Sequence, residues 1–250
     1  MFPLRDDNPT LRTPLATMAI IALTVLAWFL LQGLGTEPAL TSSVCTFGLI
    51  PGELLGTVHP GTRVQVGQDA FCAVAPSDLT WLTPLTSMFM HGGWFHIVGN
   101  LWFLWVFGNN VEDVMGRARF VVFYLLCGLA AAAAQTFSNP SSAIPMVGAS
   151  GAIGGVMGAY AFLYPRAHVH TLIILGFYMR TVAVPASFML GYWFLLQILG
   201  GLPKLDSEGG GVAFWAHVGG FVAGVVLVYV FRKPELVAAH RALSAQPRFT

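Results

Sequence analysis

Four polar side chains, Ser150, His217, His96 and Asn100, lie within long apolar segments of this chain. Polar groups in such segments are costly and by default indicate function. Ser150 stands among small residues in "VGASGAIGG", and its hydroxyl could act as a nucleophile if an adjacent base took its proton. His217, in "FWAHVGGF", is a suitable base. The two residues therefore predict a serine–histidine pair, provided that their segments meet.

Three of these side chains, from three different segments, are predicted to lie at one depth in a membrane. Asn100, Ser150 and His217 precede the next basic residue of their own segment by 17, 16 and 15 residues. At 1.5 Å per residue, each side chain lies roughly 23–25 Å from the membrane boundary at which these basic residues stand. The hydrocarbon is about 30 Å thick, so all three are recessed slightly below the opposite surface. The basic residues used for this count are Arg117, Arg166 and Arg232.

Small residues predict that the segments of Ser150 and His217 pack closely together. Glycines follow Ser150 at intervals of four residues, and glycines follow His217 at intervals of three and then four. Such stripes let two membrane helices approach each other. A lone serine or histidine is more often a packing residue, so the prediction depends on the shared depth and on these stripes. The glycines in question are Gly154, Gly158, Gly220 and Gly224.

The composition predicts an all-α integral membrane protein. Only 9% of the 250 residues are charged and 56% are hydrophobic, whereas soluble domains carry about 25% charged residues. A membrane-spanning helix needs roughly 20 apolar residues. The apolar run at 171–179 is too short to cross and is placed at the cytoplasmic interface. Six predicted helices cover about 15–34, 94–112, 119–137, 149–165, 184–202 and 212–231.

Basic residues predict that both termini are cytoplasmic, because positive charge gathers on that side. The predicted membrane domain covers 15–232, with a cytoplasmic N-terminal segment at 1–14, a cytoplasmic tail at 233–250 and a long external loop between the first two helices. The apolar run at 15–34 is interpreted as a retained span rather than a signal peptide. We expect the protein in the plasma or inner membrane. Only Arg63 and Lys204 would be external. The ten internal residues are Arg5, Arg12, Arg117, Arg119, Arg166, Arg180, Arg232, Lys233, Arg241 and Arg248.

The three cysteines say less about function. Cys45 and Cys72 both fall in the predicted external loop, where they could form a disulfide if that side is oxidising. Two unpaired, packed cysteines fit the sequence equally well. Cys127, in the middle of a predicted helix, is expected to pack as a small apolar residue.

The motifs "HGGWFHIVGN", "GASGAIGG" and "AHVGGFVAG" occur in this order across the six predicted helices. Together with "FGLIPGELLG" and "VEDVMGRARF", they resemble the rhomboid intramembrane serine proteases over roughly residues 15–232. The resemblance implies a compact six-helix bundle whose water-accessible site is recessed from the external face. It implies that Ser150 is the nucleophile and that His217 is its general base and later general acid.

The same resemblance assigns roles to the remaining polar groups. His96 and Asn100 match a His-x-x-x-Asn pair that steadies the oxyanion, with the backbone amide of Ser150 as a further donor. No acidic third member is evident, so the site resembles a dyad. Some rhomboids have an aromatic residue that stacks on the histidine where this chain has Gly154, so other packing must orient His217. Glu112 is interpreted as structural.

The resulting hypothesis is a serine endopeptidase that cleaves single-pass membrane proteins within or near their transmembrane segment. Its expected partners are these substrates and the lipid bilayer, with no nucleic acid, no cofactor and no metal. A non-catalytic relative that binds transmembrane clients is the main alternative. A transporter or channel is disfavoured because no inverted repeat is evident. A metalloprotease is disfavoured because "HExxH" is missing from the sequence.

Overall fold

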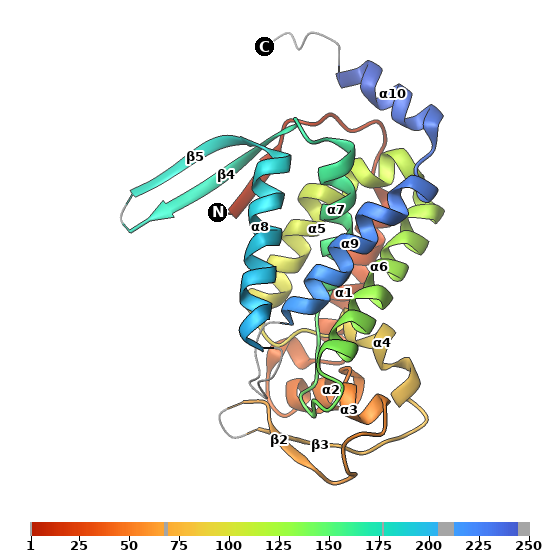
Figure 1. Cartoon of the computed structure of the whole chain (residues 1–250), viewed down its shortest axis with the longest axis vertical. Coiled ribbons are helices and arrows are strands. Elements are labelled where there is room, and N and C mark those ends of the chain that lie inside the picture. The colour runs from red at the N-terminus through yellow and green to blue at the C-terminus, as the bar shows by residue number, and fades with distance from the viewer. Residues whose placement is uncertain (1, 68–69, 177, 205–212, 245–250) are drawn as a thin grey trace.

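The computed structural model describes residues 2–67, 70–176, 178–204 and 213–244. Long helices run side by side along one axis, with short elements at both ends (Figure 1). Three predictions fall partly outside the described residues: position 212 of the last predicted helix, residues 245–250 of the predicted tail, and Arg248 among the internal basic residues.

Six apolar helices form the bundle, and each lies within or close to one of the six predicted ranges. The largest difference is in the first helix, which ends at residue 30 rather than 34. By length and composition, α6 and α9 could cross a membrane, whereas α1, α7 and α8 are shorter apolar helices. The helices are α1 (Leu15–Leu30), α5 (Trp94–Met115), α6 (Arg117–Ser138), α7 (Ser150–Leu163), α8 (Ala186–Gly201) and α9 (Phe214–Phe231).

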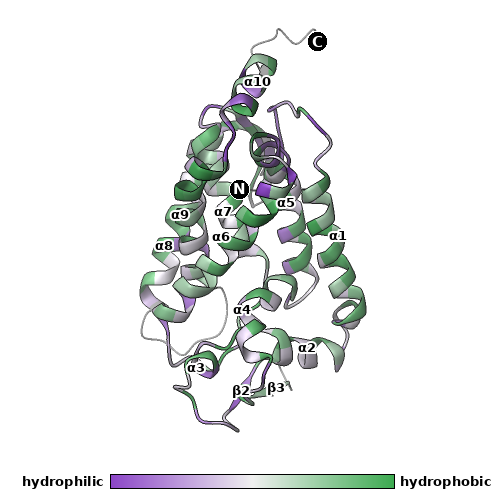
Figure 2. Ribbon diagram, turned by 90° about the vertical axis from the view of Figure 1, so that its right-hand side faces the viewer, coloured by the Kyte–Doolittle hydropathy of each residue, from purple (hydrophilic) through white to green (hydrophobic). Residues whose placement is uncertain are grey.

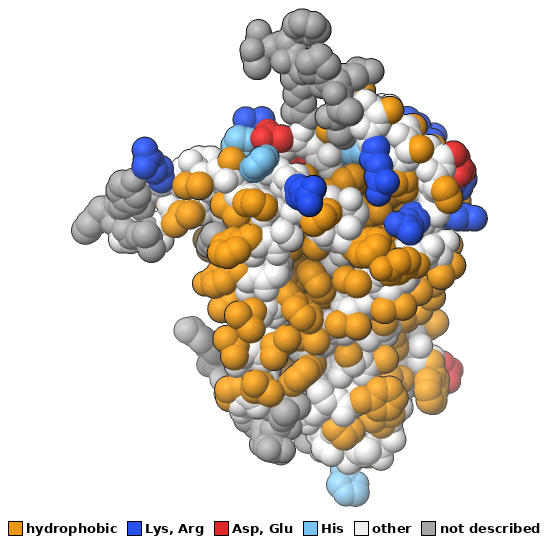
Figure 3. All heavy atoms as spheres, turned by 45° about the horizontal axis from the view of Figure 1, so that its top comes forward, with side chains coloured by type: hydrophobic (Ala, Val, Ile, Leu, Met, Phe, Trp, Pro, Cys, Tyr) orange, Lys and Arg blue, Asp and Glu red, His pale blue; other side chains and the backbone are white. Residues whose placement is uncertain are grey.

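The surface of the bundle is that of a membrane protein. Hydrophobic residues run along most of the helices (Figure 2), and apolar side chains cover much of the visible sides of the bundle (Figure 3). Residues such as Leu30 and Val230 are mostly exposed. Lysine and arginine side chains gather at the end that carries α10 (Pro234–Ser244), as Figure 3 shows. The chain therefore presents an apolar band with a basic cap at one end.

The all-α prediction is incomplete, because three strands form a sheet at the basic end. The antiparallel order is β1 (Phe2–Asp6), β4 (His168–Leu175) and β5 (Tyr178–Pro185). The apolar run at 171–179 belongs to this hairpin, which projects sideways in Figure 1. Its valine, isoleucine and threonine residues favour strands. Gly176 supplies the positive φ, 60°, of the turn.

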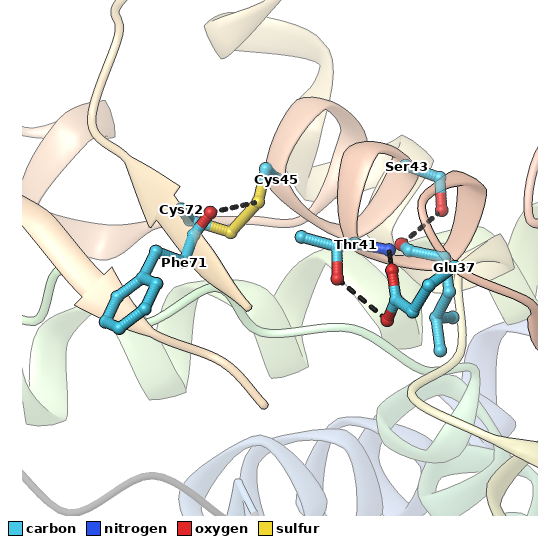
Figure 4. The surroundings of a disulfide bond; sticks show 7 residues. Glu37, Thr41, Ser43, Cys45, Phe71 and Cys72 are labelled. Carbon is cyan, nitrogen blue, oxygen red and sulfur yellow. Dashed lines mark hydrogen bonds between the residues drawn. A yellow bond between two sulfur atoms is a disulfide. The ribbon is translucent and has the colours of Figure 1, made fainter. Parts of the chain in front are cut away.

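At the other end, the long loop between α1 and α5 contains several short elements. They are α2 (Ala39–Phe47), α3 (Pro51–Leu54), β2 (Arg63–Gln65), β3 (Phe71–Ala73) and α4 (Thr83–Thr86), with 3₁₀ turns at Gly33–Gly35, Thr80–Leu82 and Ser87–Phe89. A disulfide joins Cys45 of α2 to Cys72 of β3, with their Cα atoms 5.3 Å apart (Figure 4). The question that the sequence left open is therefore answered in favour of the bond.

Glu112 has the structural role that its position indicated. Its carboxylate accepts hydrogen bonds from the backbone amides of Ala16 and Thr17, at 3.0 and 2.8 Å, and from the Thr17 hydroxyl at 2.9 Å. These amides belong to the first turn of α1, where backbone donors lack partners within the helix. The carboxylate of α5 thus caps α1 and fixes the two helices together.

The glycines of α9 bring it into backbone contact with α7. A Cβ atom at Gly220 would overlap the carbonyl oxygen of Gly151, and one at Gly224 would overlap that of Gly155. No side chain fits at either position, so only glycine permits the approach. Gly151 and Gly155 lie beside the stripe that the sequence singled out on α7.

The glycines of α7 that were singled out face the same partner. A Cβ atom at Gly158 would overlap the carbonyl oxygen of Phe221, and one at Gly154 would lie 3.1 Å from that of His217. The helices α7 and α9 therefore meet along both backbones. This contact fixes where the first turn of α7 stands relative to His217.

Replacing Gly224 by alanine should force α7 and α9 apart. Because the added methyl group meets backbone rather than a flexible side chain, we expect a loss of about 1–3 kcal/mol of stability, the usual cost of overpacking. The matched control is Gly191→Ala on α8, where a Cβ atom has no neighbour within 4 Å. Unfolding of both purified variants in detergent measures the difference, and equal stability would contradict the close packing.

Candidate active site

The first turn of α7 lies inside the molecule because the chain before it enters as extended backbone. Met146 exchanges two backbone hydrogen bonds with Leu49, at 2.9 and 2.7 Å, and the Gly148 amide donates to the Ser87 carbonyl at 2.9 Å. These contacts tie the segment to the loop at the disulfide-bearing end. The helix then begins at Ser150, and its first amides have no acceptors within the helix.

Ser150 and His217 are in direct contact. The Ser150 Oγ lies 2.7 Å from the Nε2 atom of His217, within the normal range of a hydrogen bond. The pair joins the first residue of α7 to the first turn of α9. The close packing of these helices therefore brings together the two residues that the sequence predicted to meet.

A residue that the sequence analysis missed contacts the other side of the imidazole. The Oε1 atom of Gln197, on α8, lies 2.7 Å from the Nδ1 atom of His217. Gln197 is a polar residue inside the apolar run "WFLLQILGG", so the rule that singled out Asn100 could have found it. Trp193, one turn earlier on α8, places its ring 5.6 Å from the imidazole, between ring centres.

His96 and Asn100 lie on α5 and face the residues just before Ser150. The Nδ1 atom of His96 accepts a hydrogen bond from the Gly92 amide at 3.3 Å, so its Nε2 atom carries the proton as a donor. A Cβ atom at Gly148 would lie 2.7 Å from that Nε2 atom and 3.6 Å from the Asn100 amide nitrogen. The Nε2–H group of His96 and the amide nitrogen of Asn100 are thus two hydrogen-bond donors beside the backbone that precedes Ser150.

Gly148 is required by this arrangement. Its φ of 126° is one that other residues rarely adopt, and a side chain would collide with the His96 ring.

The amide nitrogen of Asn100 is buried and has no partner among the described residues. A buried donor without a partner usually has an explanation, such as a group that binds there.

The turn before α5 holds His96 in place. The Gln32 side chain makes two hydrogen bonds, both 2.8 Å long, with the backbone of His91. The His91 ring packs edge-on against His96, with ring centres 5.1 Å apart. Burial, assisted by neighbouring His96, lowers the pKa of His91 to about 3, so the ring stays neutral.

A cavity of about 870 Å³ connects these groups. Among the described residues, its wall includes the polar side chains of His96, Asn100, Ser150 and His217 and the rings of Phe103 and Trp193. The polar side chains of Gln135, Asn139 and Ser142 also border it. In the described part of the chain, no cluster of three potential metal ligands occurs.

Comparison with known proteins identifies the fold family. A family model described as the Rhomboid domain matches residues 78–234. The chain is 27% identical over 233 residues to the Rhomboid protease GluP of Bacillus subtilis. The matched region covers 93% of this chain and 38% of that protein. This chain is 31% identical over 157 residues to the Rhomboid-like protein 11, chloroplastic, of Arabidopsis thaliana, covering 61% of this chain and 53% of that protein.

The chain is also 25% identical over 169 residues to the Rhomboid protein 1, mitochondrial, of Saccharomyces cerevisiae, covering 65% of this chain and 45% of that protein. It spans less than two thirds of the length of each of these relatives. The matched region contains α5 to α9 and the four residues proposed for the site, His96, Asn100, Ser150 and His217. On this evidence, the chain belongs to the rhomboid family.

Proposed function

We propose that this protein is an intramembrane serine endopeptidase that cleaves single-pass membrane proteins within or near their transmembrane segment. The observation that carries the proposal is the 2.7 Å contact between Ser150 and His217 at the wall of a cavity. Membership of a family with members named as rhomboid proteases supports it. The fold alone would not be sufficient, because function depends on the site.

The first step is attack by Ser150 on the scissile carbonyl carbon of the substrate. His217 Nε2 accepts the hydroxyl proton as the Oγ–C bond forms, and the carbonyl oxygen takes up the negative charge. His217 then donates this proton to the leaving nitrogen, and the C–N bond breaks to leave an acyl-enzyme. A water molecule gives a proton to His217 as its oxygen bonds to the acyl carbon. The C–Oγ bond then breaks, the carboxylic acid product leaves, and His217 returns the proton to the Ser150 oxygen.

Three donors are available for the negative charge on the substrate oxygen. They are the backbone amide of Ser150, at the start of α7, the Nε2–H group of His96 and the amide group of Asn100. Donors that are fixed before the reaction stabilise the transition state without reorganisation. The positive end of the α7 dipole favours the same charge.

The membrane topology is part of the proposal. Six spans would place the basic end, with both termini, in the cytoplasm, and the disulfide-bearing loop outside. A disulfide on that side fits an oxidising compartment. The substrate would meet Ser150 near the external end of its transmembrane segment. Its helix must unwind locally, because a helical backbone shields the scissile carbonyl.

Cleavage of a single-pass model substrate in liposomes tests the proposal. Ser150→Ala and His217→Ala should each abolish cleavage, and the double variant should be no worse, because members of a catalytic unit are not additive. Ser138→Ala, which changes another serine of the cavity wall, is the matched control and should retain activity. Full activity in Ser150→Ala would refute the assignment. An inactive wild type would favour the non-catalytic client binder.

Asn100→Ala tests the oxyanion role. Removing one oxyanion donor typically lowers turnover by about 10²–10³. Since the Asn100 amide nitrogen has no partner among the described residues, its loss should leave the melting temperature almost unchanged. Asn110→Ala is the control on the same helix: its amide donates to the Pro9 carbonyl at 2.9 Å, so its loss should lower stability instead. Normal turnover with a lower melting temperature in Asn100→Ala would contradict the proposal.

Cleavage should also depend on pH. Protonated His217 cannot accept the proton of Ser150, so activity should fall as the pH is lowered into the acidic range. The initial rate of cleavage between about pH 4 and 9 measures this dependence. A rate that stays constant down to the acid end, in protein that remains folded, would count against His217 as the base.

A further inference from the structure

A side chain of α8 contacts the ring of His217 on the side away from Ser150. Gln197 is 8% exposed, and its Oε1 atom lies 2.7 Å from the Nδ1 atom of the imidazole. We propose that Gln197 is a positioning residue that completes a Ser150–His217–Gln197 triad. This inference rests on the proposed function for its importance in the reaction, although the contact itself is a property of the folded chain.

The orientation of the Gln197 amide determines which atom faces the histidine. Its Nε2 group donates a hydrogen bond to the Trp193 carbonyl at 3.2 Å. Turning the amide over would bring two carbonyl oxygens together and lose this bond. The Oε1 atom therefore faces His217, and an oxygen of this kind only accepts hydrogen bonds.

An acceptor at Nδ1 fixes the tautomer of the imidazole. In the neutral ring, one nitrogen carries the proton and the other has a free lone pair. Gln197 selects the form protonated at Nδ1, so the lone pair of Nε2 points at Ser150, 2.7 Å away. The opposite tautomer could not accept the serine proton. Serine triads of other folds use an aspartate at this position for the same purpose.

A second residue of α8, Trp193, packs against the imidazole of His217 and fixes the plane of that ring. Trp193 lies one turn before Gln197, and its ring packs on the imidazole at 5.6 Å with an angle of 40° between the planes. On α7, by contrast, a side chain at Gly154 would press on the His217 backbone, because its Cβ atom would lie 3.1 Å from the carbonyl oxygen. Apart from the hydrogen bond with Ser150 itself, the contacts with Gln197 and Trp193 that orient the ring come from α8 rather than from α7.

A neutral amide suits the surroundings of His217. A carboxylate buried in an apolar bundle carries a large desolvation cost, whereas an amide with both ends hydrogen-bonded does not. Within the described chain, no acidic side chain is hydrogen-bonded to His217. Gln197 can thus set the tautomer without placing a charge beside the transmembrane helices.

Nitrogen NMR of ¹⁵N-histidine-labelled protein in micelles tests the contact without relying on proteolysis. The His217 signals, identified by their loss in His217→Ala, should show the Nδ1-protonated tautomer at neutral pH. In Gln197→Leu, a substantial fraction should change to the Nε2-protonated form. An unchanged tautomer in Gln197→Leu, or the Nε2-protonated form in the wild type, would overturn the inference even if Ser150 proves to be the nucleophile.

Kinetics of the same variants test the consequence for the reaction. Hydrogen-bond partners of metal-bound histidines typically matter by about 10–100-fold, and we expect Gln197→Leu to lower kcat by a comparable factor with little change in KM. Gln197→Glu keeps an acceptor: in this apolar bundle its carboxyl should stay neutral, donate to the Trp193 carbonyl and accept from Nδ1, so kcat should return to within a few-fold of wild type. Leu190→Ala, a buried change on the same helix, should lower the melting temperature without lowering kcat in the folded fraction.

The two readouts separate the possible failures. A wild type that shows the expected tautomer but no cleavage would refute the proposed protease and leave the Gln197 contact intact. An active wild type with equal kcat in Gln197→Leu would refute the positioning role alone. The same role would be refuted if Gln197→Glu were as slow as Gln197→Leu, because the acceptor would then not be what matters.

Discussion

The backbone contact between α7 and α9 is the constraint on which the rest of the site depends. Glycines at Gly220 and Gly224 let α9 touch the carbonyl oxygens of α7, which no larger residue permits. Serine has a short side chain, so its hydroxyl reaches an imidazole on another helix only if the two backbones are close. The Ser150–His217 distance of 2.7 Å is a direct consequence of this packing.

The polar groups around Ser150 are neutral, and most of them are held by other neutral groups. The Gly92 amide fixes the tautomer of His96, and the carbonyl of Trp193 orients the amide of Gln197. In an apolar bundle, this arrangement avoids the cost of buried charge. The Asn100 amide nitrogen differs, because it has no partner among the described residues and faces the cavity. A substrate oxygen is the partner that the proposed mechanism supplies.

The sequence predicted the helical segments closely and predicted that Ser150 and His217 would meet, because helix length and small-residue spacing are one-dimensional properties. The family was predicted from the motifs around Ser150, His96 and His217, and the family match confirms it. The strands of 168–185 were missed because an apolar run of this length does not distinguish a strand from a short helix. The disulfide could not be decided, since pairing depends on the distance between Cys45 and Cys72 in the fold.

Gln197 was missed for a different reason. Its importance arises from a contact between α8 and α9, and no spacing within either helix encodes that contact. The lone polar residue in an apolar run was the available signal, but a glutamine can also be satisfied within its own helix, as its bond to the Trp193 carbonyl shows. Only the fold shows that the other end of the same amide meets the imidazole.

The most direct test of the account is the rate at which a fluorophosphonate modifies Ser150, located by peptide mass spectrometry in protein reconstituted into liposomes. The account predicts one adduct, on Ser150, that forms in the wild type and in Gly191→Ala but at a strongly reduced rate in Gly224→Ala and His217→Ala. An unmodified Ser150 in the wild type would contradict the claim that α7–α9 packing creates an activated serine. An equal rate of modification in Gly224→Ala would contradict it as well.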